Sequence, residues 1–324
     1  MAAANDCPEP GKLYKEVITL DGVRTVLSKI LPQRKIHKHV IVVIPGNPGL
    51  IEFYDDFVTS LFDALQGQLP VFGISHTGHS PIDCYPVCPG KNCSAEQSYA
   101  AESYRFPLSL EEQILQKNLF LEKHIAPHSK IILIGHSMGA YVILNLLKGC
   151  ERLSDISKAI LLFPTVERMA ISPNGRFVTP SVMYLRWIGI LAAAAFSFLP
   201  QVVKKWCVQW WFSDRKGIMP SVVDTVIKFL TYQPMDCSSR MAQEEMADVV
   251  HRDDEVIETN LEKLIFYYGT TDKWVPVSYY EDMKARFPRG EIYLCKRKFD
   301  HAFVLESSKE VAEMVSSWIQ KVAA

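Results

Sequence analysis

The chain has 324 residues, of which 48% are apolar and 22% are charged. This balance supports a large buried core and excludes an intrinsically disordered chain. The 35 basic and 36 acidic residues leave a net charge of −1, so we expect no nucleic-acid partner, which would require an excess of positive charge.

The first predicted elements are a strand, a helix and a second strand. Residues 40–44 form an uninterrupted β-branched run that stops at the Pro- and Gly-rich loop 45–49, as a buried parallel strand does. Apolar residues at every fourth position over 53–65 predict a helix, and residues 70–75 read as a strand.

Residues 77–108 have no clear period and are expected to form a long loop. Ser109 and Glu112 then have the spacing of a capping box, which predicts the start of a helix. The apolar stripe of this helix is expected at Leu110, Ile114, Leu121 and Ile125.

The rest of the chain continues the alternation of strands and helices. Apolar runs predict strands at 130–134, 158–163, 264–268 and 291–295, and helical spacing predicts helices at 138–148 and 309–322. This alternation predicts the α/β class, with a mostly parallel sheet that carries helices on both faces.

The stretch 170–262 interrupts this alternation, because it is helical and unusually apolar near its start. We therefore expect an N-terminal segment at 1–38, a core formed by 39–169 and 263–324, and a helical lid or membrane-associating insertion at 170–262.

A candidate nucleophile lies between the strand at 130–134 and the helix at 138–148. The sequence there is Gly135-His136-Ser137-Met138-Gly139, which has the pattern and the setting of the G-x-S-x-G nucleophile elbow. The two glycines allow the strand and the helix to approach closely around a strained serine. Ser137 is therefore the predicted nucleophile.

A serine nucleophile needs a base and an orienting acid, which follow in the order Ser, acid, His in this class of enzyme. Asp272 follows the strand at 264–268, and His301 is the only histidine after it. These two residues are the predicted acid and base. Glu167 and, more weakly, Asp300 are the rival acids.

The oxyanion of an acyl-transfer reaction needs two N–H donors. One is expected from Met138, the residue after the nucleophile. The other is expected from the loop 45–49, where Pro48 has no N–H; Asn47 is the first candidate, with Gly46 and Gly49 behind it.

An apolar stretch opens the insertion. Residues 187–199 carry no charge, but this run is shorter than the roughly 20 residues of a membrane span. Basic residues and clustered indoles follow, as in a monotopic membrane anchor; the alternative is a buried cap helix whose tryptophans line a pocket. The candidate lipid-contacting residues are Trp187, Leu191, Phe196, Phe198, Trp206, Trp210 and Trp211.

The cysteine pattern argues against disulfides and metal. Eight cysteines in 324 residues are too few for a disulfide scaffold, and residues 1–15 lack the apolar region of a signal peptide. Cys84, Cys88 and Cys93, with His76 and His79 nearby, match no common zinc spacing. We expect no metal and a reducing compartment.

Seven sequence blocks in order make the chain resemble the lipid droplet-associated hydrolases of the α/β-hydrolase superfamily. They are V-I-P-G-N-P-G (43–49) with F-Y (53–54), I-S-H-T-G-H (74–79), G-H-S (135–137), F-P-T-V-E-R-M (163–169), S-P-N-G-R (172–176), R-D-D-E (252–255) and Y-Y-G-T-T-D (267–272). The resemblance covers residues 40–305.

This resemblance implies an α/β-hydrolase fold and a serine esterase without a cofactor, with Ser137, His301 and Asp272 as its triad. It implies an intracellular site on lipid droplets and the cytosolic face of the endoplasmic reticulum, and neutral lipid esters, sterol esters among them, as substrates. Two alternatives remain: a lipid droplet interaction protein with an idle hydrolase core, and an acyltransferase that uses the same serine.

Overall fold

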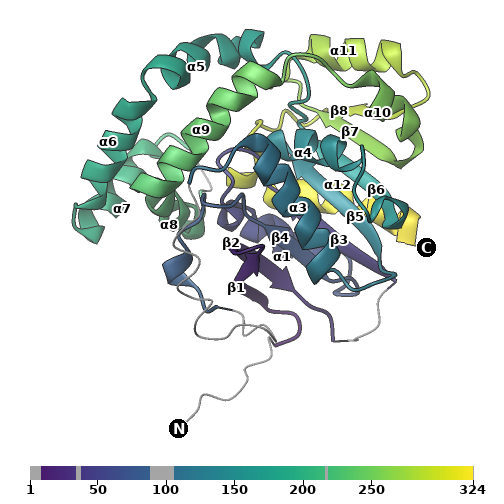
Figure 1. The fold of residues 1–324 in the computed structure, drawn as a ribbon, viewed down its shortest axis with the longest axis horizontal. Helices are drawn as coiled ribbons and strands as arrows, with labels where there is room; N and C mark the ends of the chain where they lie inside the picture. The colour runs from purple at the N-terminus through teal and green to yellow at the C-terminus, as the bar shows by residue number, and fades with distance from the viewer. Residues whose placement is uncertain (1–8, 34–37, 88–105, 216–217, 324) are drawn as a thin grey trace.

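A computed structural model describes residues 9–33, 38–87, 106–215 and 218–323. It confirms the predicted α/β class, with an eight-stranded sheet in the order β1-β2-β4-β3-β5-β6-β7-β8 (Figure 1). From β4 to β8 neighbouring strands are parallel. The strands are β1 (Leu13–Leu20), β2 (Val23–Ile30), β3 (His39–Ile44), β4 (Val71–Ile74), β5 (Lys130–His136), β6 (Ile156–Leu162), β7 (Leu264–Tyr268) and β8 (Glu291–Leu294).

Helices cover both faces of this sheet and enclose one apolar core on each side (Figure 1). The short helix η1 (Ile51–Tyr54), α1 (Asp55–Ala64) and α12 (Ser308–Ala323) pack on one face. The other face is covered by α3 (Leu110–His124), α4 (Met138–Leu146) and α11 (Val277–Arg286). The six predicted strands and the four predicted core helices all form, with ends within a few residues of those expected.

The N-terminal segment contains a hairpin that the sequence analysis did not predict. Strands β1 and β2 pair antiparallel around Asp21 and Gly22, whose φ angles are 50° and 79°. An Asp-Gly pair between apolar-rich runs is a strong hairpin signal, because both residues tolerate positive φ. The hairpin extends the sheet through an antiparallel pairing of β2 with β4.

The buried face of α3 differs from the predicted apolar stripe. The predicted capping box forms, and Leu110, Leu121 and Ile125 are buried, but Ile114 is only partly so. The same face also buries three polar side chains, Gln113, Gln116 and Lys117. Gln113 exchanges two hydrogen bonds of 2.8 Å with the Thr77 backbone in the loop after β4. Lys117 donates to the Ser75 carbonyl at 3.0 Å, and burial lowers its pKa to about 7. Hydrogen bonds to backbone make such burial tolerable.

The helices between β6 and β7 gather over one end of the sheet (Figure 1). They are α5 (Pro173–Tyr184), α6 (Arg186–Ser197), α7 (Gln201–Trp211), α8 (Pro220–Phe229) and α9 (Tyr232–Asp248), which we call the cap; the short α10 (Asp254–Thr259) lies beside α11 (Figure 1).

Within the described part of the chain, no single helix has the length and apolarity needed to cross a membrane. The neighbouring helices α5 and α6 meet these criteria only as a pair, and their axes bend by 78° at the break between them.

Candidate active site

Ser137 occupies a strained turn between β5 and α4. Its φ of 52° and ψ of −119° lie outside the regions that non-glycine residues favour, a conformation that costs of order 1–3 kcal/mol and is typical of functional sites. The turn is held by the Ser137 N–H, which donates to the Leu162 carbonyl at 3.0 Å.

The two glycines of the motif are required by close contacts. A Cβ on Gly139 would lie 2.2 Å from the carbonyl oxygen of Ile44, and a Cβ on Gly135 would lie 2.6 Å from the backbone of Gly139. Helix α4 therefore rests directly on β3 and β5, as the elbow pattern predicted.

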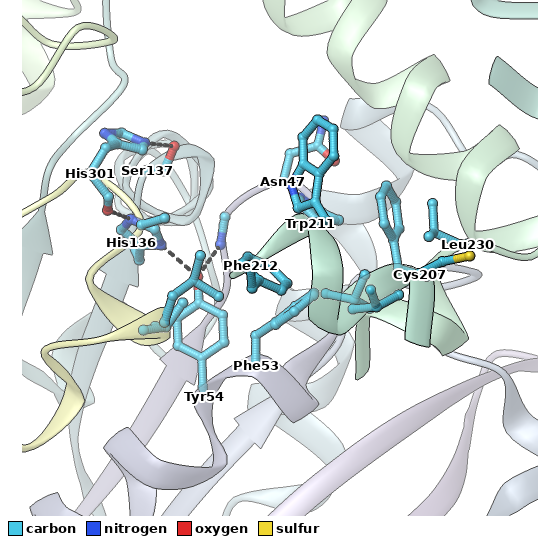
Figure 2. Close-up of a pocket in the computed structure, with 18 of the residues that line it drawn as sticks. Asn47, Phe53, Tyr54, His136, Ser137, Cys207, Trp211, Phe212, Leu230 and His301 are labelled. Carbon is cyan, nitrogen blue, oxygen red and sulfur yellow. Dashed lines mark hydrogen bonds between the residues drawn. The ribbon is translucent and has the colours of Figure 1, made fainter. Parts of the chain in front are cut away.

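The structure brings the three predicted triad residues together from three loops. Ser137 Oγ lies 2.9 Å from His301 Nε2 (Figure 2), and His301 Nδ1 lies 2.6 Å from Asp272 Oδ2. The other oxygen, Asp272 Oδ1, accepts from the N–H groups of Trp274 and Val275 at 2.7 and 3.0 Å. These two bonds fix the carboxylate so that Oδ2 faces the imidazole, which orients His301 to accept the serine proton.

The two rival acids, Glu167 and Asp300, lie near arginines and do not contact His301 Nδ1. Glu167 bonds to Arg252 at 3.0 Å and to Arg168 at 2.8 Å. Asp300 has a side chain that is 59% exposed and lies 3.8 Å from Arg215. His301 Nδ1 therefore meets Asp272 rather than either rival.

The loop after β3 narrows the choice of oxyanion donors. The Gly46 N–H donates to Tyr54 Oη at 2.8 Å, and the Gly49 N–H donates to His79 Nδ1 at 3.0 Å. Both glycine amides are thus engaged, whereas the Asn47 N–H has no partner among the described residues. The loop is beside the nucleophile, since a Cβ on Gly46 would lie 2.9 Å from Ser137 Cβ.

The second predicted donor, Met138, is the first residue of α4. The first N–H groups of a helix have no acceptor within the helix. The Met138 N–H, next to Ser137, therefore donates no hydrogen bond within α4. The oxyanion roles of Asn47 and Met138 remain predictions.

A buried hydrogen-bond chain behind the nucleophile was not anticipated from the sequence. Tyr54 Oη lies 2.6 Å from His136 Nδ1, and His136 Nε2 lies 2.9 Å from the carbonyl oxygen of His301 (Figure 2). A carbonyl only accepts, so Nε2 carries the proton of His136, and Tyr54 donates to Nδ1 while it accepts from Gly46. Burial holds the pKa of His136 well below its usual value, which agrees with a neutral ring. Only the position of His136 inside the motif hinted at this role.

An apolar cavity of about 860 Å³ opens at Ser137 and His301. Its wall includes η1, the loop after β3, and the cap helices α6, α7 and α8 (Figure 2). The aromatic residues that line it include Phe53, Phe196, Trp206, Trp210, Trp211 and Phe212. A cavity of this size and polarity suits a long or bulky apolar group.

The seven candidate lipid-contacting residues divide into two sets. Phe196 and the three tryptophans of α7 line the cavity. Trp187, Leu191 and Phe198 do not line it, and they are 56%, 60% and 88% exposed. The tryptophans of α7 are themselves largely exposed, so this helix forms both a cavity wall and an apolar surface.

The cysteines and histidines considered for metal do not assemble in the described residues. His76 and His79 are buried, whereas Cys84 is exposed, and Cys88 and Cys93 lie outside the described residues. No group of three or more His, Cys, Asp or Glu in the described ranges is arranged to hold a metal ion.

Solved structures of similar fold place the architecture among the α/β-hydrolases. A soluble variant of monoglyceride lipase from Saccharomyces cerevisiae superposes with a TM-score of 0.60 at 15% identity, over 98% of this chain and 97% of that one. An esterase from Thermogutta terrifontis has a TM-score of 0.61 at 15% identity, over 97% and 100%. The predicted α/β-hydrolase fold is confirmed.

Sequence relatives identify the family. A lipid droplet-associated hydrolase of Gallus gallus is 36% identical over 323 residues, which cover 96% of each chain. One of Drosophila melanogaster is 38% identical over 285 residues, covering 88% of this chain and 90% of the relative. The family model described as lipid-droplet associated hydrolase matches residues 37–304. The chain therefore belongs to the lipid droplet-associated hydrolase family.

Proposed function

We propose that this chain is a serine esterase that cleaves neutral lipid esters at a lipid surface. The observation that carries the proposal is the hydrogen-bonded series Ser137, His301 and Asp272 at the wall of a large apolar cavity. An activated serine explains ester cleavage, and the cavity explains a preference for apolar acyl or alcohol groups.

The proposed reaction proceeds through an acyl-enzyme. Ser137 Oγ attacks the ester carbonyl carbon while His301 Nε2 takes its proton, and the amides of Asn47 and Met138 stabilise the negative oxygen. His301 then returns the proton to the leaving alcohol. Water, deprotonated by His301, releases the acid and restores Ser137, while Asp272 holds the imidazole throughout. No cofactor takes part in these steps.

Sterol esters are the substrates that we propose within this class. The family resemblance suggests them, and a cavity of about 860 Å³ lined by aromatic rings has the size and polarity for a rigid apolar ring system or a long acyl chain. The relatives' name points to the lipid droplet as the place where such esters are met.

The exposed apolar side chains of α6 and α7 support a monotopic association with the droplet or with the cytosolic face of the endoplasmic reticulum. Indoles and a nearby lysine, Lys205, suit an interface between lipid and water. Because the α7 tryptophans also line the cavity, a lipid could pass from the surface to Ser137 without crossing water.

Labelling with a fluorescent fluorophosphonate tests the proposal without a choice of substrate. Wild-type protein should be labelled, Ser137→Ala should not be, and His301→Ala and Asp272→Ala should react much more slowly. Ser278→Ala, which removes an exposed serine on α11, is the matched control and should label as wild type. Equal labelling of Ser137→Ala would refute the assigned nucleophile, and no labelling of folded wild type would favour an idle hydrolase core.

A substrate panel then tests the ester class. Emulsions of cholesteryl oleate, trioleoylglycerol and a water-soluble short ester should show the highest kcat/KM for an apolar lipid ester, with free acid as the product. Transfer of the acyl group to an added alcohol in preference to water would identify an acyltransferase instead.

A further inference from the structure

The loop 45–49, which carries Asn47, makes its hydrogen bonds to other segments of the chain. Among the described residues no hydrogen bond joins two members of this loop, and its backbone groups bond to Tyr54 and to the loop after β4 instead. Buried backbone groups need such partners. The residues that supply them therefore decide where the Asn47 N–H points.

Two buried histidines of the loop after β4, His76 and His79, contact both ends of the Asn47 loop. Strands β3 and β4 are parallel neighbours, so the loops at their carboxyl ends lie side by side. His76 Nε2 lies 3.0 Å from the Pro45 carbonyl oxygen, and the His76 N–H donates to the Gly49 carbonyl at 2.9 Å. The Gly49 N–H donates to His79 Nδ1 at 3.0 Å. Asn47 lies between these two points of attachment.

The packing of His76 against this loop is close. A Cβ on Gly49 would lie 2.3 Å from Cδ2 of the His76 ring, so only glycine fits at that position. His76 and His79 are 0% and 1% exposed, and their ring centroids lie 5.5 Å apart in an edge-to-face arrangement. The two rings therefore have little freedom to move away from the loop.

The hydrogen-bond partners fix the tautomer of each ring. A carbonyl oxygen only accepts, so His76 Nε2 carries the proton and donates to Pro45. A backbone N–H only donates, so His79 Nδ1 is unprotonated and accepts from Gly49. Burial, and to a smaller extent the charge of Lys117, holds the pKa of His76 well below its usual value and lowers the pKa of His79 to about 3. Both rings are therefore neutral, as these hydrogen bonds require.

The cap helix α9 reaches the same loop through Ser238. The Ser238 carbonyl accepts from Asn47 Nδ2 at 3.0 Å, and Ser238 Oγ lies 3.0 Å from His79 Nδ1. Because this nitrogen is unprotonated, the serine hydroxyl is the donor. His79 therefore joins the Asn47 loop to the cap as well as to the loop after β4.

We propose that His76 and His79 are positioning residues that hold the Asn47 N–H toward the oxyanion. His76 acts as a donor to the Pro45 carbonyl. His79 acts as an acceptor for the Gly49 N–H. This assignment rests on the proposed function, because the direction of the Asn47 N–H matters for catalysis only if an acyl oxyanion forms. Neither histidine lines the apolar cavity, so their effect on the reaction passes through the loop.

Glutamine and asparagine at each position of the full chain test the proposal, because their amide groups end near different ring nitrogens. The glutamine amide ends near the place of Nε2 and the asparagine amide near that of Nδ1. At position 76 a donor is needed near Nε2, so His76→Gln should keep kcat within about threefold of wild type and His76→Asn should lower it by about tenfold or more.

At position 79 the order should reverse. An acceptor is needed there near Nδ1, so His79→Asn should keep kcat within about threefold of wild type and His79→Gln should lower it by about tenfold or more. KM should stay unchanged in all four variants, because the interaction with the oxyanion is made only in the transition state. A purely structural need for a polar side chain would give the same order at both positions.

His39→Gln is the matched control. His39 is also buried, at the opposite end of β3 from the Asn47 loop, so this variant should keep the wild-type kcat. The same order of glutamine and asparagine at positions 76 and 79 would overturn the proposal, as would an unchanged kcat in all four variants. If His76→Asn or His79→Gln does not fold, the other two variants still decide, since a loss of folding or of kcat in either would also overturn it.

Hydrogen exchange separates this proposal from the proposed function. The Gly49 amide should be protected in wild type and in His79→Asn, and should exchange at least about tenfold faster in His79→Gln. This difference does not require a reactive Ser137. Equal protection in His79→Asn and His79→Gln would overturn the proposal. A protein that shows the expected difference but cleaves no ester would contradict the proposed function and leave the hydrogen bond from Gly49 to His79 in place.

Discussion

His136 donates from Nε2 to the backbone carbonyl of His301 across 2.9 Å. This bond links the residue before the candidate nucleophile to the residue that carries the candidate base, although the two are 165 positions apart. It fixes the position of the loop after β8 relative to the turn at Ser137. It therefore helps to keep His301 Nε2 within hydrogen-bonding distance of Ser137 Oγ. The opposite side of His136 depends on Tyr54.

Tyr54→Phe should impair both stability and catalysis. The change removes the hydroxyl that bonds to Gly46 and His136, leaving a buried donor and a buried acceptor unpaired at a cost of about 1–3 kcal/mol. Chemical denaturation should show this loss, and kcat should fall more than KM changes. Tyr279→Phe is the control, since that hydroxyl makes a single bond to the Arg168 carbonyl; a kcat effect of equal size there would contradict the role of Tyr54.

Asp272→Asn should lower kcat by up to about 10⁴-fold, because an amide at this position favours the wrong imidazole tautomer. The two rival acids, Asp300 and Glu167, provide the controls. Asp300→Asn should be nearly neutral, and Glu167→Gln should affect stability through its arginine contacts with a much smaller effect on kcat. Steady-state kinetics on the best ester measures kcat for the three variants. If Asp300→Asn or Glu167→Gln lowers kcat more than Asp272→Asn does, that residue and not Asp272 is the acid of the triad.

Two glycine-to-alanine changes within helices should have opposite effects on the free energy of unfolding. In Gly139→Ala the new Cβ meets the Ile44 carbonyl oxygen at 2.2 Å, so we expect a loss of about 3 kcal/mol in the free energy of unfolding. In Gly189→Ala of α6 nothing lies within 4 Å, and the better helix propensity of alanine should add about 0.5–1 kcal/mol. Thermal or urea unfolding measures both, and a stable Gly139→Ala would refute the close approach of α4 to β3.

Leu191→Ala should weaken binding to phospholipid vesicles or artificial droplets by roughly tenfold, because it removes apolar surface that we propose to enter the lipid. Leu191 is 60% exposed on α6, and Leu115, 52% exposed on α3, is its matched control. Vesicle co-sedimentation of Leu115→Ala should equal wild type. Equal loss in both variants would show that α6 has no special part in lipid binding.

The sequence alone determined the features that depend on local physics. Strands such as 40–44 and 264–268 could be predicted because a buried parallel strand must be continuously apolar. The position of Ser137 could be predicted because only glycine fits on either side of the elbow. The hairpin of β1 and β2 was missed although its Asp-Gly turn was present, because both strands mix charged and polar residues with the apolar ones and so lack the continuous apolar run of the parallel strands.

Only the tertiary structure decided which groups meet across the chain. It chose Asp272 over Glu167 as the neighbour of His301, since loop paths and arginine contacts, not sequence order, set these distances. It also brought Tyr54 to His136 and Ser238 to Asn47, pairs that no periodicity marks. Such contacts arise because a parallel sheet collects the carboxyl ends of distant strands at one edge, and a cap folds over that edge.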